Sequence, residues 1–281
     1  MKTTVYGAII VVLSLSFVFL AAAERSNLVR VSDGKDISFG AMMQDVMRSD
    51  VIVIGEVHGI PQHHAKELEI IRALHESGTP FIIGMEMFRS ESQKDLDSWT
   101  NGDMPLRQFV PIYYRNWNIR WTLYADIFLY VREHNIPIVG LNIPDEISDA
   151  VARRGFSALN DSERKRIPAG ISCTIDESYR GFIRKAYAGH GKNEESSFLQ
   201  FCEAQMVWDK SMAANLVTFM QANPGKKAVV LAGVGHAWRR GIPEQLSLLS
   251  KYQTQVVLQL MSDQVELKSI TVEDADYIVL P

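Results

Sequence analysis

Acidic and imidazole side chains follow directly after short apolar runs at three places in the chain. Glu56, His58, Glu86 and His236 each lie one to three residues beyond a glycine that ends such a run. Carboxylates and imidazoles transfer protons near neutral pH and ligate divalent metals. A buried carboxylate or imidazole is costly unless it is paired. Four such groups at equivalent positions therefore predict a site rather than ordinary packing.

Four apolar runs rich in β-branched residues predict the strands that position these groups. The runs lie at 51–54, 81–83, 138–141 and 228–232. Each is typical of a buried parallel strand, and helical patterns separate them. The alternation predicts an α/β fold with a central, mostly parallel sheet and flanking helices. Ligands bind outside the carboxyl ends of such strands, so the four groups and Asn142 are expected to converge at one mouth.

The chain from about 142 to 221 is too long for a simple crossover of about a dozen residues. It predicts an inserted helical subdomain, which includes a helix at 198–220. After the fourth strand, a short helix that opens at Pro243 and further strands at 255–260 and 265–272 are expected. No repeat or linker interrupts the pattern, so one elaborated domain is predicted.

The N-terminal residues are typical of a secretory signal peptide. A nearly uncharged run at 5–20 is followed by three alanines before Glu24, which predicts cleavage after residues 1–23. Cleavage would give an exported, periplasmic protein with its single domain at 24–281, whereas a retained run would attach the chain to the membrane. No cysteine lies near the cleavage site to accept a lipid.

Composition and cysteine content limit the classes of partner. The 281 residues include 29 basic and 33 acidic side chains, a net charge of −4, which argues against nucleic acid as a partner. With 47% apolar and 22% charged residues, the chain can bury a sizeable core. Cys173 and Cys202 can pair in an oxidising compartment or remain two buried thiols.

Aromatic and basic residues are concentrated between the second and third predicted strands. This segment contains Arg107, Tyr113, Tyr114, Arg115, Trp117, Arg120, Trp121, Tyr124 and Phe128. Such a stripe often forms part of a core. Tyrosine is also an axial ligand of haem iron, and arginine pairs with carboxylates, so a haem site is an alternative interpretation.

Six sequence blocks together resemble the ChaN-type haem-binding family, a bacterial group associated with iron uptake. The blocks are Gly55-Glu56-Val57-His58 with His64, Gly84 to Phe88, Gly140 to Pro144, Ala204-Gln205 with Trp208-Asp209 and Met212-Ala213, Gly233-x-Gly235-His236, and Gly241-Ile242-Pro243. The resemblance implies an exported haem-binding protein of haem or iron acquisition that is not an enzyme. It also implies a tyrosinate ligand, a homodimer with cofacial haems, and a haem-uptake partner in the envelope or outer membrane.

The same resemblance implies particular haem contacts. Tyr124 is the first choice of axial ligand, with Tyr113 or Tyr114 behind it, and His190 would assist the iron. The remaining contacts carried over are His58, His64, Trp121, Phe128, Gln205 and Met212.

The glycine-led strand ends also resemble a wider superfamily of TIKI-type metal-dependent proteases and erythromycin-esterase-like hydrolases. In this alternative, Glu56, His58, Glu86 and His236 hold a divalent metal ion or act as acid and base. Haem ligation by Tyr124 leaves these four groups unexplained, so haem binding and metal-dependent hydrolysis both remain open.

Overall fold

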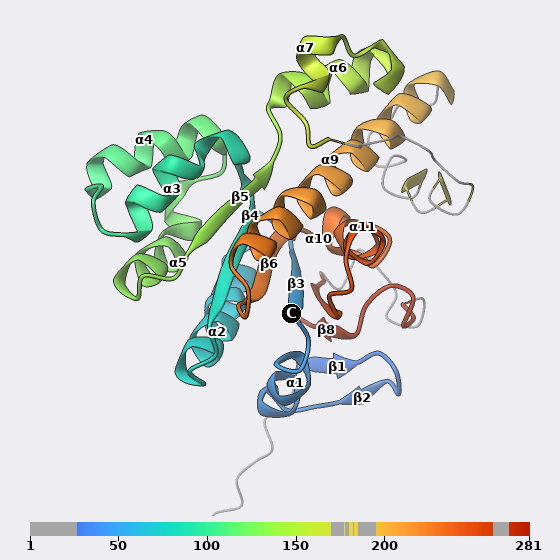
Figure 1. Cartoon of the computed structure of the whole chain (residues 1–281). Helices are drawn as coiled ribbons and strands as arrows, with labels where there is room; N and C mark the ends of the chain where they lie inside the picture. The colour runs from blue at the N-terminus through green and yellow to red at the C-terminus, as the bar shows by residue number, and fades with distance from the viewer. Residues whose placement is uncertain (1–26, 170–176, 178–179, 182, 185–194, 261–269) are drawn as a thin grey trace, which may run out of the picture.

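The fold is an α/β sheet structure (Figure 1), and the computed structural model describes residues 27–169, 177, 180–181, 183–184, 195–260 and 270–281. In these residues, eight strands form one sheet in the order β2-β1-β8-β7-β3-β6-β4-β5. The strands from β8 to β5 run parallel, and β1 and β2 are antiparallel at one edge. The strands are β1 Leu28–Arg30, β2 Lys35–Asp36, β3 Val51–Glu56, β4 Phe81–Arg89, β5 Ile138–Asn142, β6 Lys227–Gly233, β7 Thr254–Gln259 and β8 Tyr277–Val279.

The predicted fold class and its four central strands are confirmed. The predicted runs correspond to β3, β4, β5 and β6, and the strand expected at 255–260 corresponds to β7. The prediction of a strand at 265–272 is wrong for residues 270–272, which form no strand; 265–269 lie outside the described residues. The place beside β7 is taken by β8, which has only three residues and is too short for a pattern-based prediction.

Helices cover both faces of the sheet. The helices are α1 Phe39–Val46, α2 Pro61–Glu76, η1 Ser90–Ser92, α3 Gln93–Thr100, α4 Leu106–Asn116, α5 Trp121–Glu133, α6 Asp145–Arg154, η2 Phe156–Ala158, α7 Asp161–Arg164, α9 Glu195–Ala222, α10 Val234–Ala237 and α11 Ile242–Leu249. Helices α6, α7 and α9 lie in the stretch for which inserted helices were predicted, and α11 begins next to Pro243. Local signals mark the starts of the first two helices: Ser38 caps α1 by accepting from the Ala41 N–H, and Pro61 occupies the first turn of α2.

The alternation of side chains along the strands divides the interior into two cores. On β3, Ile52 and Ile54 pack with α1 to α5, whereas Val51 and Val53 pack with α9 and α11. Successive side chains of a strand point to opposite faces, so both faces of this strand are buried. Glu56 shares the parity of Ile54, and it therefore projects towards the side of the sheet that carries α2 and α5.

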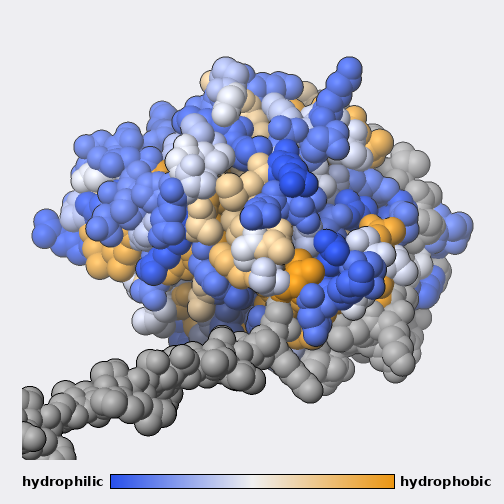
Figure 2. Space-filling view, turned by 90° about the horizontal axis from the view of Figure 1, so that it is seen from below, coloured by the Kyte–Doolittle hydropathy of each residue, from blue (hydrophilic) through white to orange (hydrophobic). Residues whose placement is uncertain are grey.

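The surface and termini add little to the predicted localisation. Figure 2 shows one face of the molecule, on which hydrophilic residues surround a smaller area of apolar ones. Among the described residues, no helix is long and apolar enough to span a bilayer. Residues 1–23, His190 and Cys173 lie outside the described residues, and Cys202 is buried.

Candidate functional site

The structure brings the four predicted polar groups to one end of the sheet. Glu56 is the last residue of β3 and His58 follows it, Glu86 lies in β4, and His236 lies in α10, directly after β6. His58 Nδ1 lies 2.8 Å from Glu56 Oε1, and His236 Nε2 lies 3.7 Å from Glu86 Oε1. A Cβ at Gly233 would come within 2.8 Å of His58 Nε2, so this glycine allows the ring to lie against the end of β6. The parallel strand ends therefore position the cluster as the sequence predicts.

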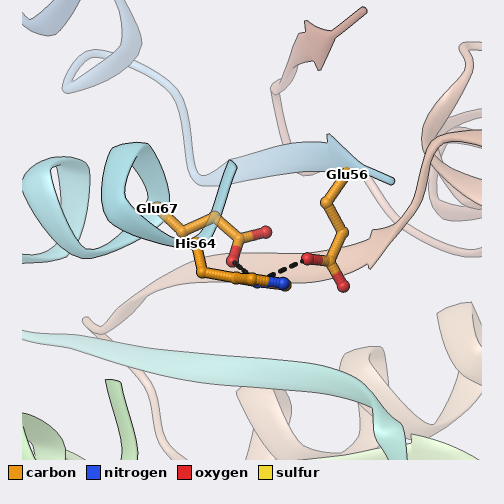
Figure 3. Close-up of side chains that lie close together, drawn as sticks. All are labelled: Glu56, His64 and Glu67. Atoms are coloured by element: carbon orange, nitrogen blue, oxygen red, sulfur yellow. Dashed lines mark hydrogen bonds and ion pairs between the residues drawn. The ribbon is translucent and has the colours of Figure 1, made fainter. Parts of the chain in front are cut away.

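The first half of the cluster consists of Glu56 and the side chains that contact it, and it lies between β3, α2 and α5. The Tyr124 hydroxyl donates a hydrogen bond of 2.5 Å to Glu56 Oε1, and His64 Nδ1 lies 2.8 Å from Glu56 Oε2. Glu67, one helical turn after His64, places Oε2 3.3 Å from the same Nδ1 (Figure 3). The carboxylate of Glu56 thus connects β3 to both α2 and α5.

These contacts change the pKa values of the first half. Burial alone would raise the pKa of Glu56, but hydrogen bonds and positive charge from His58 and His64 outweigh it and lower the pKa to about 2. Burial opposes charge on His64, yet the hydrogen bonds and negative charges of Glu56 and Glu67 raise its pKa to about 10. Burial and the charge of Glu56 raise the pKa of Glu67 to about 8. Glu56 and His64 therefore form a buried ion pair at neutral pH.

The second half of the cluster consists of Glu86 and His236 with Asp209, and it lies on the opposite side of the sheet, against α9. His236 Nδ1 donates to Asp209 Oδ1 at 2.7 Å, and Glu86 Oε2 accepts from the Gly233 N–H at 2.6 Å. Burial opposes charge on His236, but the charges of Glu86 and Asp209 raise its pKa to about 9. The carboxylate of Asp209 also fixes the ring, so that Nε2 faces Glu86.

A cavity of about 280 Å³ opens beside the cluster. Its walls are Glu86, Met87, Arg89, Tyr114, Arg115, Asn116, Trp117, Asn118, Asn142 and Asp145. The Trp117 ring also meets the His58 ring edge-on, with centroids 4.9 Å apart. The predicted convergence of Asn142 with the cluster is confirmed, since its amide donates to the Glu86 carbonyl at 2.9 Å.

Comparison with known proteins identifies the family. Residues 42–246 match the family described as "Haem-binding uptake, Tiki superfamily, ChaN". The chain belongs to this family. The matched range of the ChaN family runs from α1 to α11 and includes both halves of the cluster.

Solved structures support the same fold. A structure described as cofacial heme binding to ChaN of Campylobacter jejuni has a TM-score of 0.70 and 22% identity, covering 89% of this chain and 94% of that one. An erythromycin esterase EreC mutant in its open conformation has a TM-score of 0.51 and 12% identity, covering 83% of this chain and 77% of that one. At these identities the similarity establishes the fold and not the activity. No curated protein matches the chain.

For a member of the ChaN family, the placement of the three candidate tyrosines is informative. Tyr124 and Tyr113 have no exposed surface, and the Tyr113 hydroxyl donates to the Ile119 carbonyl at 2.9 Å. Burial and the charges of Glu56 and Glu67 raise the pKa of Tyr124 far above its ordinary value. Tyr114 is 50% exposed and lies on the wall of the cavity. The Tyr114 side chain is thus accessible from the cavity, whereas Tyr113 and Tyr124 are enclosed by packing.

The remaining predicted haem contacts do not line one open cleft. Phe128 and Met212 have no exposed surface, and they belong to the cores on opposite sides of the sheet. The sheet lies between these two side chains. Trp121 and Gln205 are half-buried.

Glu67 is the member of the cluster that the sequence analysis did not predict. The signal that would have found it is its spacing from His64, because residues three apart on a helix are neighbours. His63, the other histidine of this turn, accepts a hydrogen bond of 2.9 Å from the Val57 N–H through Nδ1. It holds the loop after β3 rather than joining the cluster.

Proposed function

We propose that this protein binds haem in haem or iron acquisition, with ferric iron held by the phenolate of Tyr114 at the mouth of the sheet. The observation that carries the proposal is the match of residues 42–246 to the haem-binding uptake family. The role of Tyr114 is supported by its exposure and by its place on the cavity wall. Tyrosinate is an established ligand type for haem iron.

The surroundings of the Tyr114 oxygen suit a negative charge. It accepts a hydrogen bond of 3.0 Å from the backbone N–H of Trp121, the first residue of α5. The N-terminus of a helix carries partial positive charge and stabilises anions. Tyr124, in contrast, donates to a carboxylate, which opposes loss of its proton. The local chemistry therefore favours Tyr114 over Tyr124 as the iron ligand.

Neighbouring side chains suit the rest of the macrocycle. Trp117 offers a flat apolar surface in the same cavity, and Arg115 is exposed beside Tyr114. Arginine pairs with carboxylates in a bidentate manner, so Arg115 is placed to bind a propionate. The proposal includes export to the periplasm, delivery to an envelope partner, and a homodimer in which two haems lie face to face at the open mouths.

A hemin titration tests the proposal. Addition of hemin to the purified haem-free protein is expected to give a shifted Soret band that saturates at one haem per chain. The His236→Ala variant should bind equally well, since His236 is not among the residues that line the cavity beside Tyr114. Absence of any shift at stoichiometric hemin would overturn the proposal. Sedimentation of the haem-loaded protein as a monomer would show that the proposed homodimer is wrong.

Hydrolysis is the second candidate function, and the arrangement of Asp209, His236 and Glu86 favours it. A carboxylate that orients a histidine, whose second nitrogen faces a second carboxylate, is suited to general acid–base catalysis. If the haem-free protein cleaves p-nitrophenyl acetate through this group, Asp209→Asn and His236→Ala should lower the rate by about 10²–10⁴-fold. Equal rates in the wild type and both variants would reject hydrolysis at this site.

A further inference from the structure

Three electron-pair donors face one another on the α2 and α5 side of the sheet. His64 Nδ1 lies 2.8 Å from Glu56 Oε2 and 3.3 Å from Glu67 Oε2, and Figure 3 shows both carboxylates directed at the ring. Glu56, His64 and Glu67 each offer one ligand atom, and these atoms all lie within 4.8 Å of one another. The side chains of both glutamates are 0% exposed, and that of His64 is 3% exposed. The group is thus a closed set of donors rather than a solvated acidic patch.

The other nitrogen of His64 is already used as a donor. Nε2 lies 3.0 Å from the carbonyl oxygen of His58, which can only accept a hydrogen bond. A neutral His64 therefore carries its proton on Nε2 and presents a lone pair at Nδ1. Histidines that bind metals characteristically donate their second N–H to a carbonyl or carboxylate, which fixes the ring and the tautomer.

Each of the two carboxylates has one buried oxygen to which no described residue outside the cluster donates a hydrogen bond. Glu56 Oε1 accepts hydrogen bonds from Tyr124 and His58, which leaves Oε2 for the cluster. Glu67 Oε1 is buried, and no described residue donates a hydrogen bond to it. A buried carboxylate oxygen without a donor is costly. A cation at the centre would give this oxygen a partner.

We propose that Glu56, His64 and Glu67 form a binding site for a divalent first-row transition-metal ion such as Zn²⁺. One imidazole nitrogen and two carboxylate oxygens are ligands that zinc accepts, with bonds of about 2.0–2.2 Å. Ligand atoms 2.8 and 3.3 Å apart need move little to surround such an ion. The metal ion takes the place of the proton between His64 Nδ1 and the carboxylates. Metal uptake therefore releases a proton to solvent.

The proposed site borders a cavity through His64 and shares one residue with the four groups at the strand ends. A cavity of about 610 Å³ between α2 and α5 is lined by His64, Ala65, Leu68, Thr122, Leu123 and Ile127, among others. Of the four strand-end groups, only Glu56 belongs to the site. The three ligands come from the end of β3 and one turn of α2, and Tyr124 of α5 supports them.

Metal loading of the haem-free protein tests the proposal. After removal of metal with a chelator and dialysis against Zn²⁺, elemental analysis is expected to find one zinc per chain, with a higher melting temperature. Glu67→Gln should weaken zinc binding at least about 100-fold, since loss of a supporting partner alone costs about 10–100-fold. Two matched controls, Glu69→Gln on the exposed part of the same helix and Glu86→Gln at the strand ends, should bind as the wild type does.

A measurement on the wild type keeps the test independent of the variants. X-ray absorption of the zinc-loaded protein is expected to show one imidazole and two carboxylates around the ion. Two imidazoles, or loss of zinc in Glu86→Gln but not in Glu67→Gln, would place the metal between His58 and His236 and overturn the proposal. Failure of the wild type to retain stoichiometric zinc would do the same, whatever the result of the hemin titration.

Discussion

Replacement of Tyr114 by Phe is expected to abolish the shifted Soret band at stoichiometric hemin and to weaken haem binding at least about 100-fold. Tyr114 is the candidate phenol whose side chain is exposed on the cavity wall, and the substitution removes only its hydroxyl. Because the side chain is half exposed and its hydroxyl accepts a single hydrogen bond among the described residues, from the Trp121 N–H, the fold should change little. Absorption titrations with hemin, alongside urea denaturation of the haem-free protein, measure the two effects separately.

The matched control is Tyr124→Phe, which removes one hydroxyl from the same aromatic region. This variant should keep the Soret shift but lose about 1.5–3 kcal/mol of stability, because a hydrogen bond to a charged carboxylate disappears. The reverse result, with haem lost in Tyr124→Phe and kept in Tyr114→Phe, would assign the iron to Tyr124. In that case α5 and β3 would have to separate when haem binds.

The sequence predicts the meeting of the strand ends because it depends on two simple rules. Apolar β-branched runs identify the strands, and parallel strands bring their carboxyl ends to one edge. The position of Glu56, Glu86 and His236 at that edge follows from these rules. These rules do not predict the side of the sheet to which each side chain points, because β3 is buried on both faces and its apolar run shows no alternation.

The choice among the tyrosines also lies beyond pattern reasoning. Tyr113 and Tyr114 are neighbours on α4, and one is fully buried while the other is half exposed. Which of them faces solvent depends on how α4 packs against Phe88 and Trp121, a long-range arrangement that helical spacing does not contain. Glu67 was missed because a glutamate within a charged helix is ordinarily solvated.

Replacement of Glu56 by Gln is expected to lower the free energy of unfolding by about 3–5 kcal/mol, measured by urea denaturation at pH 7 with a chelator present. Removal of one partner of a buried ion pair leaves the other charge uncompensated. Here the imidazolium of His64 would keep only Glu67, and Tyr124 would donate to a neutral amide. The control Glu69→Gln, which breaks an ion pair with Lys66 on the partly exposed side of α2, should change stability by no more than about 0.5 kcal/mol.

The pH dependence of the stability of Glu56→Gln tests whether Glu56 stabilises the fold through its charge or only through packing. The pKa of Glu56 is about 2 in the folded chain and 4.5 in its ordinary state, so folding favours the ionised form. This contribution, at most about 3 kcal/mol, is fully present above pH 4.5 and is lost as the pH falls towards 2. The stability difference between the wild type and Glu56→Gln should therefore shrink steadily over that window. A difference that is constant from pH 6 to pH 3, or absent at pH 7, would show that the carboxylate does not hold β3, α2 and α5 together through its charge.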